Sequence, residues 1–189
     1  MSIYKKNLEL LTKNNVYSKE MEHDACGVGL IASTEGKKSR EVVEYGIEAL
    51  KAVWHRGAVD ADGKTGDGAG IHLEIPKDFF VEKIEVTGHT HDGSDICVGM
   101  IFLPRNDYAA QESCKTIVES ELTKNDFSIY GWRQVPVNPK VLGEKALQTM
   151  PEIIQVLFKA NNKNLLDKDL ERKIYETRKK IENKAFNLS

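Results

Sequence analysis

A chain of 189 residues is the size of one domain and is long enough to bury a hydrophobic core. Its 27 basic and 29 acidic residues leave a net charge of −2, which argues against a surface dedicated to nucleic acid or to anionic membranes. No stretch approaches the ~18 consecutive apolar residues of a membrane span.

Residues 1–25 are polar, and we interpret them as a leader that is removed. They lack the apolar centre of a secretory signal. Residues 26–33 read as a buried strand with two glycines, and 39–54 as an amphipathic helix with Ser39 as its N-cap. Gly46, in the middle of that helix, suggests close packing against a sheet. Residues 55–70 hold five glycines and predict a loop.

The rest of the chain alternates further strands and helices. Strands are predicted at 71–75, 84–86, 96–103 and 127–137, and helices at 109–122, 144–160 and 167–186. Strands early and late with helices between them favour an α+β layered sandwich.

Three cysteines are present: Cys26, Cys97 and Cys114. Their odd number, wide spacing and lack of a CxxC pair predict neither a disulfide framework nor a metal site. Reduced thiols favour a cytoplasmic location. Cys97 and Cys114 are expected to be core residues on a strand and a helix.

Cys26 stands where the polar leader meets the first predicted strand. If the bond from Ala25 to Cys26 is cut, one residue carries both a thiol and a free α-amine. An α-amine has a pKa of about 7.7–8.0 and can act as the base that forms the thiolate, whereas an amide nitrogen cannot. The alternative is that Cys26 is a small buried hydrophobic residue, as most such cysteines are.

The runs 54–63 (WHRGAVDADG) and 64–71 (KTGDGAGI) follow Cys26 in one order and spacing. With them the chain closely resembles the amino-terminal glutamine amidotransferase domain of the glutamate synthase large subunit. That domain is a class II amidotransferase with an N-terminal nucleophile (Ntn) fold. The resemblance covers about 22–182 and includes 48–57 (EALKAVWHRG) and 130–137 (YGWRQVPV). It implies an α/β/β/α sandwich.

The resemblance also implies a chemistry. Cys26 is expected to hydrolyse L-glutamine through a thioester, and the ammonia released is expected to aminate 2-oxoglutarate in a separate synthase domain. The full enzyme is expected to use FMN, an iron–sulfur cluster and a reductant, none bound by this chain, and to include further domains and a small subunit. Arg56 and Gly57 are expected to support the Cys26 region, while Gly68 and Gly70 let the backbone pass close to the substrate pocket.

Several motifs have competing interpretations. Arg56 either orders the Cys26 region or forms a salt bridge with Asp60 or Asp62. His55 is expected to be structural rather than a general base. The glycine-rich run is no Walker loop, because its Lys-Thr precedes the glycines, and no EF-hand, because Ile71 occupies the twelfth position. Four polar residues that follow one another closely could bind a metal: His89, His91, Asp92 and Asp95. Chance clustering on the surface is the favoured interpretation.

Parts of the family pattern are missing. The family supplies oxyanion donors from an Asn-Gly dipeptide, and this chain has none. The family's downstream arginine and aspartate, which hold the α-carboxylate and α-amine of glutamine, are missing too. We therefore expect residues 26–189 to be the amino-terminal part of the domain, incomplete at its C-terminus. A truncated reading frame, a fragment and one product of a split gene all remain open. The alternative function is a non-catalytic remnant, or a subunit half that needs the missing part.

Overall fold

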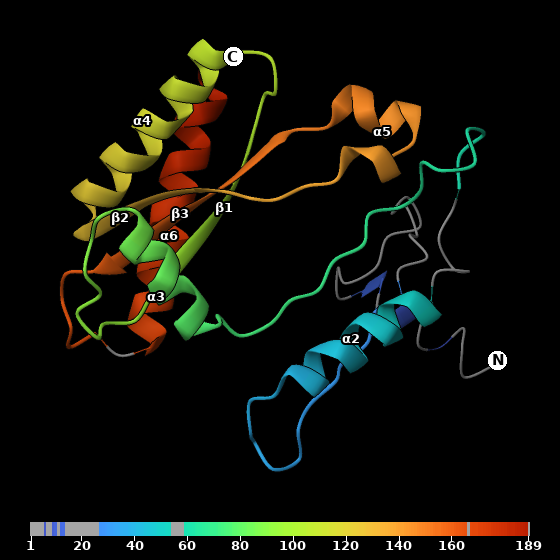
Figure 1. The fold of residues 1–189 in the computed structure, drawn as a ribbon, viewed down its shortest axis with the longest axis horizontal. Coiled ribbons are helices and arrows are strands. Elements are labelled where there is room, and N and C mark those ends of the chain that lie inside the picture. The colour runs from blue at the N-terminus through green and yellow to red at the C-terminus, as the bar shows by residue number, and fades with distance from the viewer. Residues whose placement is uncertain are drawn as a thin grey trace. The chain divides into compact units, whose positions relative to one another are not determined.

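A computed structural model describes residues 6, 9, 10, 12, 13, 27–53, 59–165 and 167–188 (Figure 1). The chain divides into two compact units. The first unit is Met1–Val59 with Gly66–Ile71, and the second is Asp60–Thr65 with His72–Ser189. The short piece Asp60–Thr65 therefore belongs to the second unit, although the chain on both of its sides belongs to the first.

In the first unit, the predicted helix is confirmed as α2, Arg40–Ala52. Ser39 is its N-cap, and the Ser39 hydroxyl accepts a hydrogen bond from the Val42 N–H at 3.4 Å. A methyl group at Gly46 would lie 3.1 Å from Cδ1 of Ile71, so this glycine packs against an extended segment rather than a sheet. No described residue of this unit is buried.

The second unit is built on a three-stranded antiparallel sheet. Its strands are β1 Cys97–Leu103, β2 Phe127–Gln134 and β3 Glu152–Ala160, in the order β1-β3-β2. Cys97 pairs with Phe158 on one side of β3, and Phe127 pairs with Ala160 on the other. The register shifts between Ile129 and Gly131, where Gly131 has a φ of 146° that favours glycine.

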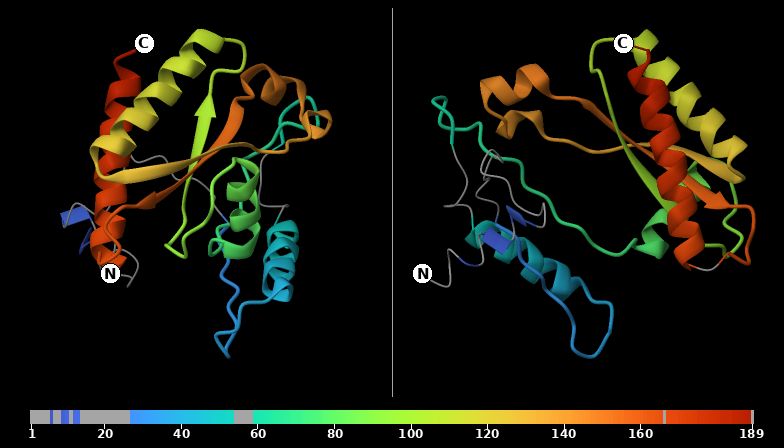
Figure 2. Two further views of the ribbon diagram at one scale, coloured as in Figure 1. Left: turned by 60° about the vertical axis from the view of Figure 1, so that its left-hand side comes forward. Right: turned by 180° about the vertical axis from the view of Figure 1, so that it is seen from behind.

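Helices cover both faces of this sheet (Figure 2). The helices α4, Tyr108–Lys124, and α6, Asp167–Phe186, lie side by side on one face. The buried residues between them and the sheet are Cys97, Val118, Leu122, Phe127, Val156 and Phe158. On the opposite face, α3, Lys77–Val86, buries Phe80 and Ile84 against Tyr130 and Leu157. None of the described helices is both long and apolar enough to cross a membrane.

One long predicted helix is wrong in its second half. Residues 144–160 form α5, Glu144–Thr149, followed by the central strand β3, and a short 3-10 helix, η2, Pro139–Val141, precedes α5. The second half is rich in β-branched residues and begins after Pro151. A central strand packed on both faces carries a near-continuous apolar run, which resembles a buried helix.

Three shorter strand predictions also fail. Residues 84–86 are the last turn of α3, because Phe80 and Ile84 have helical spacing and bury one face. Residues 27–33 and 71–75 run without strand pairing in the part of the chain described here. An extended segment becomes a strand only where a neighbour satisfies its backbone groups.

The fold class is therefore α+β, with helices on both faces of a single sheet among the described residues. This sheet and its helices agree with the predicted class at the level of mixed α and β structure.

Candidate active site

The predicted nucleophile Cys26 and two of the four predicted supporting residues, Arg56 and Gly57, lie outside the described residues. Gly68 and Gly70 are described and exposed. A Cβ atom added to either would meet no heavy atom within 4 Å. Both glycines therefore have open space beside the backbone, as do other exposed glycines such as Gly29 and Gly36.

The turn Asp60–Thr65 lies between the segment with Arg56 and Gly57 and the segment with Gly68 and Gly70. Its geometry is defined by one bridge and several hydrogen bonds. Val59 and Gly66 form an isolated antiparallel bridge. Within the turn, the Asp60 N–H donates to the Thr65 carbonyl at 2.7 Å, and the Gly63 N–H donates to the Asp60 carbonyl at 2.9 Å. Gly63 has a φ of 69°, in the left-handed region that glycine adopts without strain.

Asp62 organises this turn. Its Oδ1 accepts from the Lys64 N–H at 2.9 Å and the Thr65 N–H at 2.7 Å, and its Oδ2 accepts from the Thr65 hydroxyl at 2.6 Å. The Thr65 hydroxyl, these two N–H groups and the Glu144 N–H hold the pKa of the Asp62 carboxyl well below its usual value. Asp62 therefore stays ionised and keeps the turn closed at neutral pH.

The turn rests on the start of α5. Lys145 at the start of that helix forms an ion pair with Asp60 at 2.6 Å. Gly143 is buried, and a Cβ atom there would overlap the side chains of Asp62 and Thr65. Sequence reasoning considered Asp60 and Asp62 only as partners of Arg56 or as calcium ligands, and missed this arrangement. The run Asp62-Gly63-Lys64-Thr65 could have indicated this turn, because an Asp side chain often accepts hydrogen bonds from the backbone N–H groups two and three residues later.

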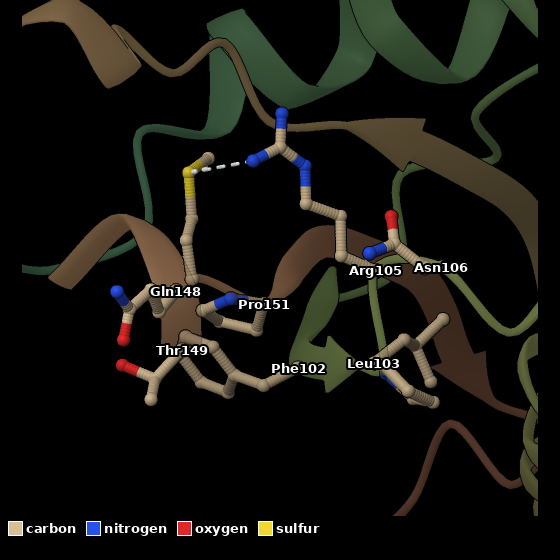
Figure 3. Close-up of a pocket in the computed structure, with 9 residues that line it drawn as sticks. Phe102, Leu103, Arg105, Asn106, Gln148, Thr149 and Pro151 are labelled. Atoms are coloured by element: carbon tan, nitrogen blue, oxygen red, sulfur yellow. Dashed lines mark hydrogen bonds between the residues drawn. The ribbon is translucent and has the colours of Figure 1, made fainter. Parts of the chain in front are cut away.

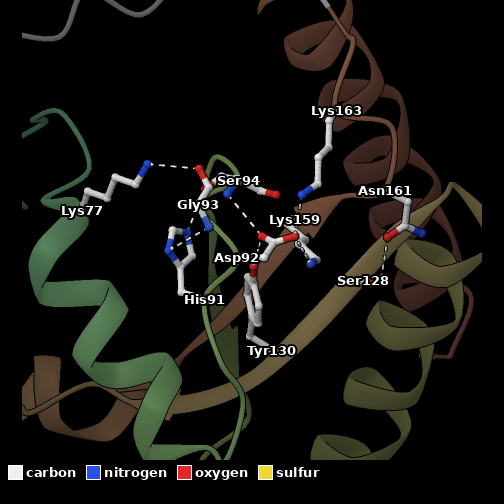
Figure 4. A network of polar contacts seen from close by, with 10 residues as sticks. All are labelled: Lys77, His91, Asp92, Gly93, Ser94, Ser128, Tyr130, Lys159, Asn161 and Lys163. Carbon is white, nitrogen blue, oxygen red and sulfur yellow. Dashed lines mark hydrogen bonds and ion pairs between the residues drawn. The ribbon is translucent and has the colours of Figure 1, made fainter.

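Of the predicted polar cluster, His91 and Asp92 lie in a network of hydrogen bonds and ion pairs (Figure 4). Lys159 and Lys163 each lie 2.9 Å from the Asp92 carboxylate, and the Tyr130 hydroxyl donates to it at 3.4 Å. Nε2 of His91 lies 2.8 Å from the Ser94 carbonyl. Among the described residues, no group of three or more His, Cys, Asp or Glu side chains could hold a metal ion.

Two open recesses flank the segment that leads from α5 into β3. One, of about 390 Å³, lies between the ends of β1 and α5 and is lined by Phe102, Arg105 and Thr149 among others (Figure 3). There, Nη1 of Arg105 lies 3.8 Å from Sδ of Met150. The other, of about 410 Å³, is lined mainly by apolar residues, including Leu142. Gly68 and Gly70, the predicted site residues that the structure describes, line neither recess.

Of the two described cysteines, Cys97 lacks the properties of a nucleophile. Cys97 is buried on β1, and burial raises the pKa of its thiol to about 12. Cys114 is half-buried on α4. Because a thiolate is the reactive species, Cys97 is a structural residue.

Comparisons with known proteins agree with the motifs. The family model of class II glutamine amidotransferases matches residues 26–189, a match that begins at Cys26. The glutamate synthase [NADPH] large chain of Azospirillum brasilense is 54% identical over 179 residues, which cover 95% of this chain and 12% of that protein. The ferredoxin-dependent glutamate synthase 1 of Arabidopsis thaliana is 42% identical over 162 residues, 85% of this chain and 10% of that protein. The chain thus spans about a tenth of the length of the curated relatives it matches.

Proposed function

This chain belongs to the class II glutamine amidotransferases, and on that premise we propose that it is the glutamine-hydrolysing part of a glutamate synthase. One observation carries the proposal: the family match begins at Cys26, the residue that sequence chemistry singled out. The 54% identity to a glutamate synthase large chain, over 95% of this chain, supports the same assignment.

In the proposed reaction, the Cys26 thiolate attacks the side-chain amide carbon of L-glutamine. The C–N bond breaks, ammonia leaves with the proton taken from the thiol, and a γ-glutamyl thioester remains. Water then cleaves the thioester to release glutamate and the thiol. The α-amine of Cys26 shuttles the protons, which requires that the leader 1–25 is removed.

Four further residues have supporting roles in the proposal. Arg56 and Gly57 order the region of Cys26, and Gly68 and Gly70 allow the backbone to pass close to the substrate. The open space beside Gly68 and Gly70 is compatible with their part of this assignment.

The proposed fold is the α/β/β/α sandwich of the Ntn enzymes. Two helices, α4 and α6, pack on one face of the described sheet. On the other face α3 covers only part, and Met100 and Phe102 are 48% and 63% exposed. Apolar side chains in such positions support a second sheet packed against this face.

The wider enzyme is part of the proposal. The ammonia is passed to a synthase domain that forms glutamate from 2-oxoglutarate with FMN and an iron–sulfur cluster, and a small subunit is a proposed partner. The described residues of this chain do not fit an iron–sulfur cluster, because they offer no group of metal ligands. The names of the relatives include both NADPH and ferredoxin as reductants. A cytoplasmic location is proposed because the two described cysteines, Cys97 and Cys114, form no disulfide.

A second candidate function is favoured by one observation. The sequence has no Asn-Gly dipeptide to stabilise the oxyanion, and losing one such donor typically lowers the rate by ~10²–10³. Residues 1–189 by themselves are then inactive, and the chain works only as part of a larger assembly.

The test is Cys26→Ser in the complete enzyme. Glutamine-dependent glutamate formation is expected to be abolished and ammonia-dependent formation to survive. Cys114→Ser, at a half-buried position on α4, is the matched control and should change neither. Loss of both activities, or of neither, with Cys26→Ser contradicts the proposal. Intact mass of the active enzyme is expected to show a chain that starts at Cys26, and full activity from a chain starting at Met1 rules out the amine base.

A further inference from the structure

The α3–β1 loop, residues 87–96, belongs wholly to the second unit and is held by polar contacts (Figure 4). Its Asp92 is paired with two lysines, one at the end of β3 and one just after that strand. Lys77, the first residue of α3, donates a hydrogen bond to the Gly93 carbonyl at 3.4 Å. The loop is therefore tied to β3 on one side and to the start of α3 on the other.

The imidazole of His91 makes two hydrogen bonds inside this loop, and they need opposite roles from its two nitrogens. Nε2 lies 2.8 Å from the Ser94 carbonyl, which can only accept, so Nε2 must carry a proton. Nδ1 accepts from the Gly93 N–H at 3.3 Å, so Nδ1 must carry none. This pattern requires the neutral imidazole, because an imidazolium has a proton on both nitrogens and cannot accept the Gly93 bond.

His89 in the same loop offers a contrast. The rings of both histidines lie beside Tyr130, with centroids 6.2 and 6.3 Å from the centroid of its ring. Nδ1 of His89 lies 3.1 Å from the Thr87 hydroxyl, which itself donates towards the carbonyls of Ile84 and Tyr130. A hydroxyl that donates to a carbonyl can also accept from Nδ1, so protonating His89 breaks none of these hydrogen bonds.

Charged side chains of both signs surround His91. The charged and titratable groups are Lys77 on α3, Tyr130 on β2, Lys159 on β3, Lys163 after β3, and His89, Asp92 and Asp95 on the loop itself. The Ser94 hydroxyl and the two lysines of β3 and its end hold the pKa of the Asp92 carboxyl well below its usual value, and burial raises the pKa of Tyr130. Neither Asp92 nor Tyr130 therefore changes charge between neutral and mildly acidic pH. The hydrogen-bond geometry at His91 then decides how the loop responds to acid.

We infer that His91 is a proton-sensitive latch on the α3–β1 loop. At neutral pH the latch is closed, because Nδ1 receives the Gly93 N–H while the Nε2 proton holds the Ser94 carbonyl. A proton taken up from solvent at Nδ1 breaks the Gly93 bond and leaves two N–H groups facing each other. The loop then opens more often, and the Gly93 carbonyl that Lys77 binds loses its support. Every contact of the latch lies in the second unit, so the inference does not rest on the proposed function.

Hydrogen exchange of the complete enzyme, read by mass spectrometry on peptides that cover 88–96, tests the latch. Exchange is measured at about pH 7.5 and about pH 5, on either side of the range in which an imidazole ordinarily takes up a proton. Dividing by the rate of the same peptides in urea-unfolded enzyme removes the direct effect of pH on exchange. Protection is expected to fall roughly three- to tenfold at the lower pH, the effect of losing one hydrogen bond.

Two substitutions of His91 separate the hydrogen bond from the proton. His91→Asn keeps an acceptor oxygen for the Gly93 N–H, since an Asn side chain commonly accepts from the backbone N–H two residues later, and it does not titrate. This variant should show high protection at both pH values. His91→Ala removes the acceptor and should show low protection at both. His89→Asn is the matched control and should keep the wild-type response to pH.

The outcomes that overturn the inference are distinct. One is a wild-type protection that does not change with pH, and another is a pH response that persists in His91→Asn or disappears in His89→Asn. A third is a His91→Ala variant as well protected at neutral pH as the wild type. Peptides from β3 should keep their protection throughout, so a loss in acid that extends to 152–160 is global unfolding and also overturns the latch.

Discussion

The two units of this chain differ in how much buried core their described residues form. The second unit has a sheet, three packed helices and buried clusters on both faces. The first unit, in its described residues, has one helix and extended segments, with no buried side chain. Yet Cys26, Arg56, Gly57, Gly68 and Gly70 all belong to the first unit. The residues proposed for the chemistry thus lie in the unit that has no core among its described residues.

This contrast shows that the residues with proposed chemical roles are not the residues that form the hydrophobic core. A glycine-rich loop gives a backbone access to a substrate but buries little apolar surface. The strands and helices of the second unit bury surface but carry none of the predicted site residues. Four predictions test the contrast.

The largest expected effect is on thiol reactivity. At pH 8, Cys97 should be alkylated by iodoacetamide about a thousandfold more slowly in the native protein than in urea, since burial raises the pKa of its thiol to about 12. Cys26, as the proposed nucleophile, should react fast in the processed enzyme. Peptide mapping by mass spectrometry after timed quenching gives both rates. Equal native rates at Cys26 and Cys97 break the contrast.

The second largest expected effect is on the free energy of unfolding, which substitutions in the two units should change by different amounts. Leu157 on β3 is 0% exposed, and Leu157→Ala is expected to lower the free energy of unfolding by about 2–5 kcal/mol. Leu30 in the first unit is 89% exposed, so Leu30→Ala is expected to change it by less than about 0.5 kcal/mol. Urea unfolding followed by circular dichroism measures both. A large effect at Leu30 shows that residues 27–33 are packed in solution.

Helix caps offer a matched pair with a smaller effect. Asp107 caps α4 through the Ala110 N–H at 2.9 Å, and Asp107→Ala should cost about 1 kcal/mol of global stability. Ser39→Ala removes the equivalent cap of α2 and should leave the unfolding midpoint of the sheet unchanged. If both variants shift that midpoint equally, the two units unfold together and the contrast fails.

The smallest expected effect concerns the ion pair between α4 and α6. Lys184 lowers the pKa of Glu121, with a smaller contribution from Lys124, and Glu121 raises the pKa of Lys184. The contribution of Glu121 is therefore present above its unfolded pKa of about 4.3 and is lost as pH falls below it. That of Lys184 is present below about 10.4 and is lost as pH rises through its folded pKa.

Glu121→Gln is expected to flatten the fall of the urea midpoint between about pH 5 and pH 3. Glu85→Gln, an exposed position on α3, is the control and should leave the slope unchanged. A slope that Glu121→Gln does not alter shows that Lys184 gives the carboxylate no net stabilisation.

Helices and strands whose apolar residues recur with a clear helical or strand period could be predicted from the sequence. Helices α2, α4 and α6 and strands β1 and β2 are confirmed within a few residues, because each has one apolar face. The strand β3 was missed because a strand packed on both faces has no alternation, and α3 because only Phe80 and Ile84 mark its buried side.

The candidate site divides in the same way. Cys26 could be singled out by its position after the polar leader, and the His-Arg-Gly run by its resemblance to the family. The close approach of Asp62 to Gly143 could not be predicted, because these residues are far apart in the sequence and no sequence pattern links them. Which residues the turn meets depends on where β2 and β3 place α5.

The order β1-β3-β2 has a consequence for synthesis. Among the described strands, β1 and β2 each pair with β3, which is made last of the three. At ~5–20 residues per second, roughly 50 residues of translation leave β1 without a partner for several seconds. Both pairings of this described sheet therefore form only when residues 152–160 become free to insert between β1 and β2.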